Sequence, residues 1–578
     1  MHTNLQNFNL NTNFSGKNRH FFVTLHRQNV SAMYTSCKYT ARLLADALYE
    51  YGVRDVVVSP GSRNTPLILA LEATEILRKH IVIDERSAAF AALGMSLQGG
   101  RPVACICTSG SAVLNYGPAL AEAFYRCVPL IVISADRPLE WIDQDDSQTL
   151  HQHRVLGNIV KASYDIAVDE ATTAVYVNRI LNDALTMAIS RRHGPVHINM
   201  QFGEPLGETV DCADSGFRLV SHHCTGSCSV ELPEPEYNRI MIVAGFHSPD
   251  GEYSQLLYKL RAECGMAVLC EAQSNVDGIG AAPALKALGH HELAVDYAPG
   301  LVISTGGGVV SKELKRYLRE TPLSEHWYVG YGDYVVDCYR RLTRRFDMDE
   351  KTFLKALYKR YSSGPKSDFG ERWSKLHDEG AEIAREYTCR APWSDMVAVR
   401  MLLESCPESE GRTLHLSNGT AVRYAQYCSG AGWRAVECNR GVSGIDGSVS
   451  TAIGAAVAGD KVLLICGDMS AQYDMGALAM TEIPDDFRMV VLDNSGGGIF
   501  RVIGSTAGMC SEMRERYYSG NINLPLRQLA DGFGFDYYEV ASAAELRMQY
   551  PRFLGAPRKA IMRVVTDAEV SAEVFKAF

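Results

Sequence analysis

Residues 490–500 read VVLDNSGGGIF. An apolar run rich in β-branched residues ends in Asp493 and Asn494, and a serine and three glycines follow. A sharp turn needs only one or two glycines, so three of them predict that another group approaches this main chain closely. We therefore expect a buried strand of a parallel sheet, with a functional site at its carboxyl end, where such sheets bind their ligands.

The preceding apolar run, KVLLICGDMS at 461–470, ends in the same way. Gly467 and Asp468 stand at its end, directly before a helix-like segment, so we expect Asp468 to lie beside Asn494. A carboxylate, an amide oxygen and the main-chain carbonyl of Gly496 would suit Mg²⁺, which completes its shell with water and phosphate oxygens. Taken singly, Asp468 could instead cap a helix and Asn494 could form a turn.

Alternating strand-like and helix-like segments continue along the chain and predict an α/β protein with parallel sheets. We expect three doubly wound domains, at residues 33–212, 213–375 and 376–578, of which the first and third share a plan. The Asn-rich residues 1–32 have no periodicity and predict a disordered tail, with Met33 as a candidate start. The stretch TGGGVVSKE at 305–313 is not G-x-G-x-x-G, and we interpret it as a strand-to-helix turn.

The net charge, the lengths of the apolar runs and the cysteine spacing exclude several classes of function. The 578 residues carry a net charge of −10, which argues against nucleic-acid binding and against binding to anionic membranes. No apolar run reaches the roughly 18 residues of a membrane span. The 16 cysteines include no C-x-x-C pair, so we expect reduced thiols in a cytoplasmic enzyme.

The Gly-Asp and Asn arrangement resembles the cofactor signature of thiamine diphosphate enzymes. Such enzymes also need a glutamate from a first-type domain, and HIVIDERSAAF at 80–90 supplies Glu85. Burial raises the pKa of a glutamate, which makes it a competent proton partner for the cofactor's aminopyrimidine. Alternatively, Asp84, Glu85 and Arg86 could form an exposed helix start with a salt bridge.

A closer resemblance rests on VSPGSRNTPLILAL, DERSAAFAALG, SADRP and NRGVSGIDGSVSTAIGAA. These stretches are similar to the 2-succinyl-5-enolpyruvyl-6-hydroxy-3-cyclohexene-1-carboxylate synthases of menaquinone biosynthesis, over about residues 35–578. The resemblance implies a transferase with pyrimidine-binding, central and diphosphate-binding domains, thiamine diphosphate, and Mg²⁺ or Mn²⁺. It also implies a homodimer or homotetramer whose site lies between subunits. The implied reaction decarboxylates 2-oxoglutarate and adds the resulting four-carbon unit to isochorismate in a 1,4 sense.

The same resemblance assigns residues to the site. Catalysis would involve Glu85, Ser62, Arg63 and Gln148. Substrate would contact Arg63, Arg137, Gln148, Lys312, Arg423 and Arg440, with Ile499 and Phe500 as an apolar wall; arginine suits the carboxylates of both substrates. The cofactor would contact Glu85, Ile445, Gly467, Asp468, Asn494, Gly496 and Ile499, and the metal would contact Asp468, Asn494 and Gly496.

Three positions depart from the family pattern: Ser147 replaces an asparagine, Gly419 replaces a serine and Glu313 replaces a second basic residue.

One alternative function is another thiamine diphosphate-dependent 2-oxoacid decarboxylase or carboligase, such as an acetolactate synthase. Decarboxylases tend to have adjacent histidines in the first domain, whereas the candidates here are His151 and His153. A non-catalytic module with the same fold would have lost Glu85, Asp468 or Asn494, and all three are present.

Overall fold

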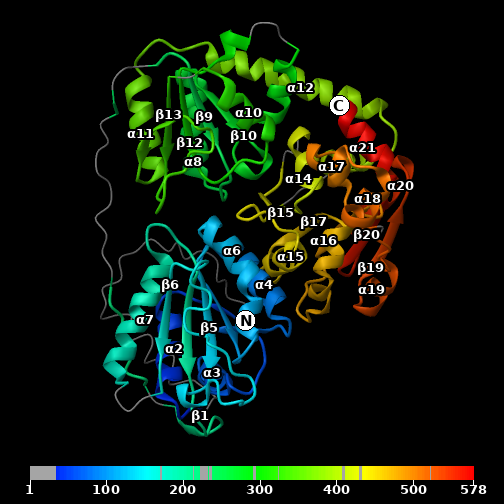
Figure 1. Cartoon of the computed structure of the whole chain (residues 1–578). Helices are drawn as coiled ribbons and strands as arrows, with labels where there is room; N and C mark the ends of the chain where they lie inside the picture. Colours follow the sequence, from blue (N-terminus) through cyan, green and yellow to red (C-terminus); the bar gives the residue numbers. More distant parts are fainter. Residues whose placement is uncertain are drawn as a thin grey trace, which may run out of the picture.

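The computed structural model describes residues 34–168, 172–212, 214–221, 232–233, 237–290, 294–322, 324–405, 411–428, 432–520 and 522–578. The predicted tail, residues 1–32, lies outside these ranges. Three six-stranded sheets organise the described chain, and all neighbouring strands within each of them are parallel (Figure 1). The α/β fold class with three parallel sheets is confirmed.

The first sheet has the order β3-β2-β4-β5-β7-β6. Apolar residues of these strands face helices on both sides and form two cores, one per face. The strands are β2 (Asp55–Val58), β3 (Arg78–Ile81), β4 (Val103–Cys107), β5 (Leu130–Asp136), β6 (Ala162–Ile166) and β7 (Val196–Gln201), and β1 (Tyr34–Ser36) pairs separately with β8 (Thr209–Asp211). The helices are α2 (Tyr39–Glu50), α3 (Thr65–Glu72), α4 (Glu85–Gly99), α5 (Ala112–Asn115), α6 (Gly117–Arg126) and α7 (Ala174–Ile189).

The central sheet has the order β11-β10-β9-β12-β13-β14. Its strands are β9 (Ile240–Ala244), β10 (Ala267–Cys270), β11 (Ile279–Gly280), β12 (Leu301–Thr305), β13 (Glu325–Val329) and β14 (Leu342–Phe346). Its helices are α8 (Gly251–Cys264), α9 (Ala281–Leu288), α10 (Lys312–Glu320), α11 (Glu350–Tyr361) and α12 (Phe369–Arg390). The domain boundary predicted between residues 375 and 376 falls inside α12, whose Phe369, Trp373 and Leu376 belong to the central core.

The third sheet has the order β16-β15-β17-β18-β20-β19. Its strands are β15 (Arg412–Leu416), β16 (Ala435–Glu437), β17 (Lys461–Gly467), β18 (Arg488–Asp493), β19 (Asp536–Val540) and β20 (Ala560–Val565). Its helices are α13 (Asp395–Glu404), α14 (Ala421–Tyr424), α15 (Ser448–Val457), α16 (Asp468–Tyr473), α17 (Gly504–Ala507), α18 (Ser511–Arg514), α19 (Leu526–Gly532), α20 (Ala543–Leu554) and α21 (Ala568–Ala577).

The strand orders relate the three sheets. When strands are numbered along the chain within each sheet, the first and third sheets both read 2-1-3-4-6-5, and the central sheet reads 3-2-1-4-5-6. The shared plan predicted for the first and third regions is therefore confirmed. No helix in the described part of the chain combines the length and apolarity needed to cross a bilayer.

Helices α4 and α15 join the first-sheet and third-sheet regions (Figure 1). They approach so closely that a Cβ on Gly94 would lie 2.0 Å from the Thr451 carbonyl oxygen, and one on Gly454 would lie 2.0 Å from that of Ala91. Only glycine permits such a backbone approach. The contact fixes the start of α4, which carries Glu85, relative to the third sheet.

Candidate active site

The predicted Asp468–Asn494 pair lies at the carboxyl ends of two adjacent parallel strands. β17 and β18 pair with Gly467 opposite Leu492, which brings the residues after both strands to one edge. Asp468 begins α16 and is 2 % exposed. Its Oδ2 accepts a hydrogen bond from the Gly496 amide at 2.7 Å, and its Oδ1 accepts one from the Met469 amide at 2.7 Å. The structure thus joins Asp468 to the glycine run.

The buried Asp468 carboxylate is electrostatically costly without a cation. Burial, followed by the charge of nearby Asp493, raises its pKa to about 7, and the two amide hydrogen bonds offset this only partly. Desolvation disfavours the charged form of a carboxyl group, and an adjacent cation favours it. A cation bound at this edge would therefore stabilise the charged form of the Asp468 carboxylate.

Asn494 is held by a residue that sequence reasoning missed. Asp395, the first residue of α13, is buried, and its Oδ2 accepts a hydrogen bond from Asn494 Nδ2 at 2.7 Å. Its Oδ1 accepts one from the Thr566 hydroxyl at 2.5 Å. This anchorage uses the donor end of the amide and leaves Asn494 Oδ1 buried without a hydrogen-bond partner.

The donor set at this edge fits a magnesium or manganese ion. Asn494 Oδ1 is an unpaired buried acceptor, Asp468 is an undercompensated carboxylate, and a Cβ on Gly467 would meet no atom within 4 Å. Hard divalent cations take oxygen ligands, and Mg²⁺ needs few from protein. Within the described residues, no group of three or more His, Cys, Asp or Glu side chains is arranged to hold a metal.

The glycines after Asn494 serve the packing of the chain on itself. A Cβ on Gly496 would lie 2.0 Å from the Ser519 carbonyl oxygen, and one on Gly498 would lie 2.9 Å from Asn494 Nδ2. The Gly496 carbonyl accepts a hydrogen bond from the Gly498 amide at 2.9 Å. The close approach predicted from the sequence thus comes from neighbouring protein segments. A carbonyl oxygen has a second lone pair, so Gly496 keeps acceptor capacity.

The residues on either side of the glycines differ in role. Asp493 is buried and pairs with Arg563 on the neighbouring strand β20 at 2.6 Å, which is a structural contact. Ile499 and Phe500 lie in a half-buried 3-10 turn, where Phe500 packs against Tyr518 with ring centroids 5.5 Å apart.

Two predicted arginines meet beside the loop that follows β16. Arg440 donates from Nη1 to Asn418 Oδ1 at 2.8 Å. Burial, and next the charge of Arg440, lowers the pKa of Arg423, while Glu313 at the start of α10 acts in the opposite direction. The Ile445 carbonyl accepts a hydrogen bond from the Ser470 hydroxyl of α16 at 3.1 Å, so the loop reaches the helix that Asp468 begins. Lys312, the first residue of α10, is exposed.

The predicted first-sheet cations form a second cluster. Arg63 is buried and donates to the Phe202 carbonyl at 2.9 Å, and it lies 3.3 Å from Glu204. Burial, and next the charge of Arg137, lowers the pKa of Arg63. Arg137 pairs with Asp146 at 2.5 Å. Sequence reasoning missed these acidic partners, which come from loops.

Ser62 and Gln148 are both exposed near this cluster. Gln148 has a positive φ of 56°, and its main chain packs against Gly110, where a Cβ would lie 3.4 Å from Gln148 Cα.

His151 and His153 do not form a paired unit, because His151 faces Asp143 at 2.8 Å and His153 faces Asp165 at 2.6 Å.

Glu85 begins α4, as the helix-start interpretation predicts, but its recorded partner is Asn115, whose Nδ2 lies 3.3 Å from Glu85 Oε2. Arg86 donates to the Tyr473 carbonyl at 3.1 Å and forms an ion pair with Asp474 at 3.7 Å. The apolar residues around this helix start face solvent: Ile83 is 81 % exposed and Tyr473 is 54 % exposed. Within the described residues, Glu85 makes no hydrogen bond or ion pair with Asp468 or Asn494.

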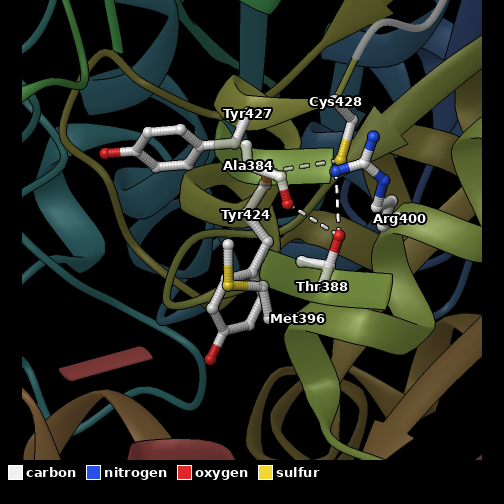
Figure 2. Close-up of a pocket in the computed structure, with 7 residues that line it drawn as sticks. All are labelled: Ala384, Thr388, Met396, Arg400, Tyr424, Tyr427 and Cys428. Carbon is white, nitrogen blue, oxygen red and sulfur yellow. Dashed lines mark hydrogen bonds between the residues drawn. The ribbon is translucent and has the colours of Figure 1, made fainter. Parts of the chain in front are cut away.

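A separate pocket lies between α12, α13 and α14 (Figure 2). Arg400 Nη1 donates to Thr388 Oγ1 there at 2.8 Å, and Cys428 and Tyr424 complete part of the wall. None of the residues predicted for the site lines this pocket. The Asp468 edge therefore remains the candidate site.

Comparison with known proteins gives two family matches. Residues 38–155 match the thiamine pyrophosphate enzyme N-terminal TPP binding domain, and residues 417–564 match the corresponding C-terminal TPP binding domain. Curated relatives cover nearly the whole chain. A 2-succinyl-5-enolpyruvyl-6-hydroxy-3-cyclohexene-1-carboxylate synthase of Porphyromonas gingivalis is 36 % identical, over 93 % of this chain and 96 % of its own length. Proteins of the same name from Bacteroides fragilis (35 %; 94 % and 99 %) and Cytophaga hutchinsonii (34 %; 93 % and 97 %) are similar.

Proposed function

This chain belongs to the 2-succinyl-5-enolpyruvyl-6-hydroxy-3-cyclohexene-1-carboxylate synthase family of thiamine diphosphate-dependent enzymes, and we propose that it performs that reaction in menaquinone biosynthesis. It decarboxylates 2-oxoglutarate and joins the remaining four-carbon unit to isochorismate by 1,4-addition, as a transferase. The observation that carries the proposal is the Asp468 carboxylate beside the unpaired Asn494 Oδ1, in a chain with this family membership.

The third-sheet edge holds the cofactor's diphosphate through a divalent ion. Asp468, Asn494 Oδ1 and the Gly496 carbonyl would be the protein ligands of Mg²⁺ or Mn²⁺, and the open side of Gly467 would leave space for phosphate oxygens. Ile445 and Ile499 provide apolar contacts to the rings. When bound, thiamine diphosphate supplies a carbon centre that stabilises the negative charge left by loss of CO₂.

The arginines bind and orient the substrate carboxylates. Arg423 and Arg440 lie together beside the cofactor edge, and Arg63 lies with Arg137 at the end of the first sheet. Neighbouring cations whose charges disfavour one another gain most from an anionic ligand. Ser62, Gln148 and Lys312 are exposed and contribute hydrogen bonds or charge from the rim, with Ile499 and Phe500 as the apolar wall.

Glu85 reaches the site from a second copy of the chain, so the active unit is a homodimer. In its own chain Glu85 contacts Asn115, and exposed Ile83 and Tyr473 beside it form an apolar surface for a partner to cover. There Glu85 would share a proton with the aminopyrimidine ring of the bound cofactor. We place the enzyme in the cytoplasm, since the described cysteines are free thiols, many of them buried.

The function is tested by mixing the protein with thiamine diphosphate, Mg²⁺, 2-oxoglutarate and isochorismate. We expect isochorismate consumption and CO₂ release only when both substrates are present. Turnover of pyruvate alone would contradict the proposal and favour an acetolactate synthase or another decarboxylase.

Glu85→Gln tests the proton partner. We expect this variant to bind thiamine diphosphate with near wild-type affinity and to lose about 10²- to 10⁴-fold in kcat, the range of general acid–base catalysis. Tryptophan fluorescence titration measures the binding, and steady-state kinetics measure the loss. Full activity would remove Glu85 from the mechanism.

Co-refolding Glu85→Gln with Asp468→Asn tests whether the site is shared between chains. Each variant alone should be nearly inactive, but a mixed dimer has one intact site of two. Random mixing should restore roughly a quarter of wild-type activity, because about half of the dimers are mixed. Failure to restore activity would place the site within one chain.

A further inference from the structure

Glu122 connects the first-sheet region to the loop that carries Arg440. It lies on α6 and is fully buried. Its Oε1 accepts a hydrogen bond from the Gly441 amide at 2.7 Å, and its Oε2 accepts one from the Val442 amide at 2.8 Å. A buried carboxylate that accepts two successive main-chain amides holds that main chain in one place, because hydrogen bonds to a charged acceptor are strong and both donors belong to adjacent residues.

Gly441 permits this contact. A Cβ at this position would lie 2.6 Å from the Glu122 carbonyl oxygen and 3.1 Å from Arg126 Cγ. The loop therefore rests directly on the surface of α6, with no side chain between them. This glycine was part of the NRGVSGIDG resemblance, and the structure supplies a physical reason for it at this position.

Arg126 holds the start of the same segment. One turn after Glu122, its Nη2 donates to Glu437 Oε2 at 2.8 Å and its Nη1 donates to the Cys438 carbonyl at 3.2 Å. Both side chains of this pair are buried, and the guanidinium lies 3.8 Å from the Phe246 ring centre of the central-sheet region. Side chains of helix α6 are thus hydrogen-bonded to this segment at residues 437–438 and again at residues 441–442.

Arg440 lies between these two fixed points. With its main chain held on both sides, its side chain is directed to Asn418, whose own Nδ2 donates to the Asn439 and Gly444 carbonyls at 2.6 and 2.7 Å. The conformation of Arg440 is therefore set by α6 on one side and by the end of β15 on the other. In Figure 1, α6 lies on the side of the first-sheet region that faces the other two.

We propose that Glu122, with Arg126, is a positioning residue that presents Arg440 to a substrate carboxylate. This inference rests on the proposed function, since it takes Arg440 as a substrate-binding residue. The guanidinium of Arg440 recognises a carboxylate only when its fork is aligned, and a shift of the loop misaligns it. Glu122 itself is fully buried with both carboxylate oxygens bound to main-chain amides, so it acts through Arg440.

The test is a double-mutant cycle between Glu122→Gln and Arg440→Gln. Glutamine offers one acceptor and points an NH₂ group at the second amide, so the loop is released on one side. We expect Glu122→Gln to raise the KM for one of the two substrates about 10- to 100-fold, with a smaller change in kcat. Combined with Arg440→Gln, it should add little, because both changes act on one contact. A wild-type KM in Glu122→Gln, or full additivity, would overturn the inference.

Gly441→Ala keeps the test valid if Glu122→Gln does not fold. The added Cβ pushes the loop away from α6 without changing any charge, and we expect the same rise in KM and the same non-additivity with Arg440→Gln. Glu482→Gln is the matched control: Glu482 contacts His80 of the first-sheet region at 2.5 Å but is not in contact with the loop. It should leave both KM values unchanged.

Amide hydrogen exchange separates this inference from the proposed function. In Glu122→Gln the Gly441 and Val442 amides should exchange at least about tenfold faster than in the wild-type protein. If the wild-type protein turns over neither substrate, the proposed function fails, and with it the substrate role of Arg440. If it turns over both and Glu122→Gln shows unchanged exchange and kinetics, only the present inference fails.

Discussion

Two glycine-containing strand ends in this molecule invite comparison, one in the central sheet and one in the third. At the central β9/β12 edge, a Cβ on Gly245 would lie 1.8 Å from the Gly307 carbonyl oxygen, so the two loops close on each other. The Gly306 amide donates to Glu350 at 2.7 Å. At the third-sheet edge, Asn494 Oδ1 has no partner and Gly467 borders open space.

The comparison shows that glycines at a strand end do not by themselves make a binding site. The central sheet has the strand order of dinucleotide-binding folds, with its switch point between β9 and β12, yet the protein's own loops fill that crevice. The interpretation of TGGGVVSKE as a turn agrees with this packing. What distinguishes the third sheet is a buried carboxylate next to an unpaired acceptor, which leaves binding capacity for a cation.

Replacing one acidic residue at the third-sheet edge and one at the central-sheet edge should give the largest difference in Mn²⁺ affinity. Asp468→Asn removes the one carboxylate of the proposed ligand set, so we expect Mn²⁺ affinity in the presence of thiamine diphosphate to fall by roughly 10³-fold, since a metal contact is worth several kcal/mol. Electron paramagnetic resonance of free Mn²⁺ measures it. Glu350→Gln, at the start of α11 in the central-sheet region, is the matched control and should leave Mn²⁺ binding unchanged. Equal losses of Mn²⁺ affinity in both variants would show that the two sheet edges do not differ in cation binding.

Asp395→Asn should produce the next largest effect. An asparagine can turn its NH₂ group toward Asn494 and favour rotation of that amide, which withdraws Oδ1 from the metal. Loss of an outer-shell partner typically costs 10- to 100-fold in metal affinity, and we expect a value in that range. Isothermal titration with Mn²⁺ and thiamine diphosphate checks it. An unchanged affinity would mean that Asp395 does not orient Asn494.

A pair of glycine substitutions should separate binding from packing. Gly467→Ala adds a Cβ that meets nothing within 4 Å, so the melting temperature should not change, while cofactor affinity should fall about tenfold as the methyl group enters the phosphate space. Gly245→Ala should lower the melting temperature through an overpacking cost of about 1–3 kcal/mol or more. Folded Gly245→Ala protein should still bind the cofactor normally. A lower melting temperature in Gly467→Ala together with weaker cofactor binding in Gly245→Ala would contradict the assignment of binding to the third-sheet edge and of packing to the central one.

The smallest expected effect is a pH dependence at the central edge. Burial lowers the pKa of His247, but hydrogen bonding to Glu350, 3.3 Å away, the charge of Glu350 and a hydrogen bond to the Ser248 carbonyl outweigh it and raise the pKa above 6.5. A raised folded-state pKa stabilises the protein below about pH 6.5, and this contribution is lost as the pH rises through the raised value.

We therefore expect His247→Gln to lower the melting temperature at pH 5.5 by an amount equivalent to about 1 kcal/mol, and by less at pH 8.5. Differential scanning calorimetry at both values measures it. A difference that grows with pH would show that His247 is neutral in the folded protein. Cofactor affinity should be the same in the variant and the wild-type protein at each pH.

The sequence by itself determined the three parallel sheets and the Asp468–Asn494 pair. Hydrophobic runs of strand length, each followed by a helical period, force adjacent parallel strands to end at one edge, so residues after β17 and β18 must meet there. The tertiary structure alone decided the contacts of Asp395, 99 residues before Asn494, and of Glu122, 319 residues before Gly441.

The structure also decided that the glycines after Asn494 serve packing, and that Glu85 contacts Asn115 within its own chain. The physical reason is that local patterns fix which residues are buried and where strands end, because both follow from side-chain periodicity. Which buried acid meets which amide depends on how whole layers pack together. In this protein, that packing places an α6 carboxylate on one loop and an α13 carboxylate on one asparagine.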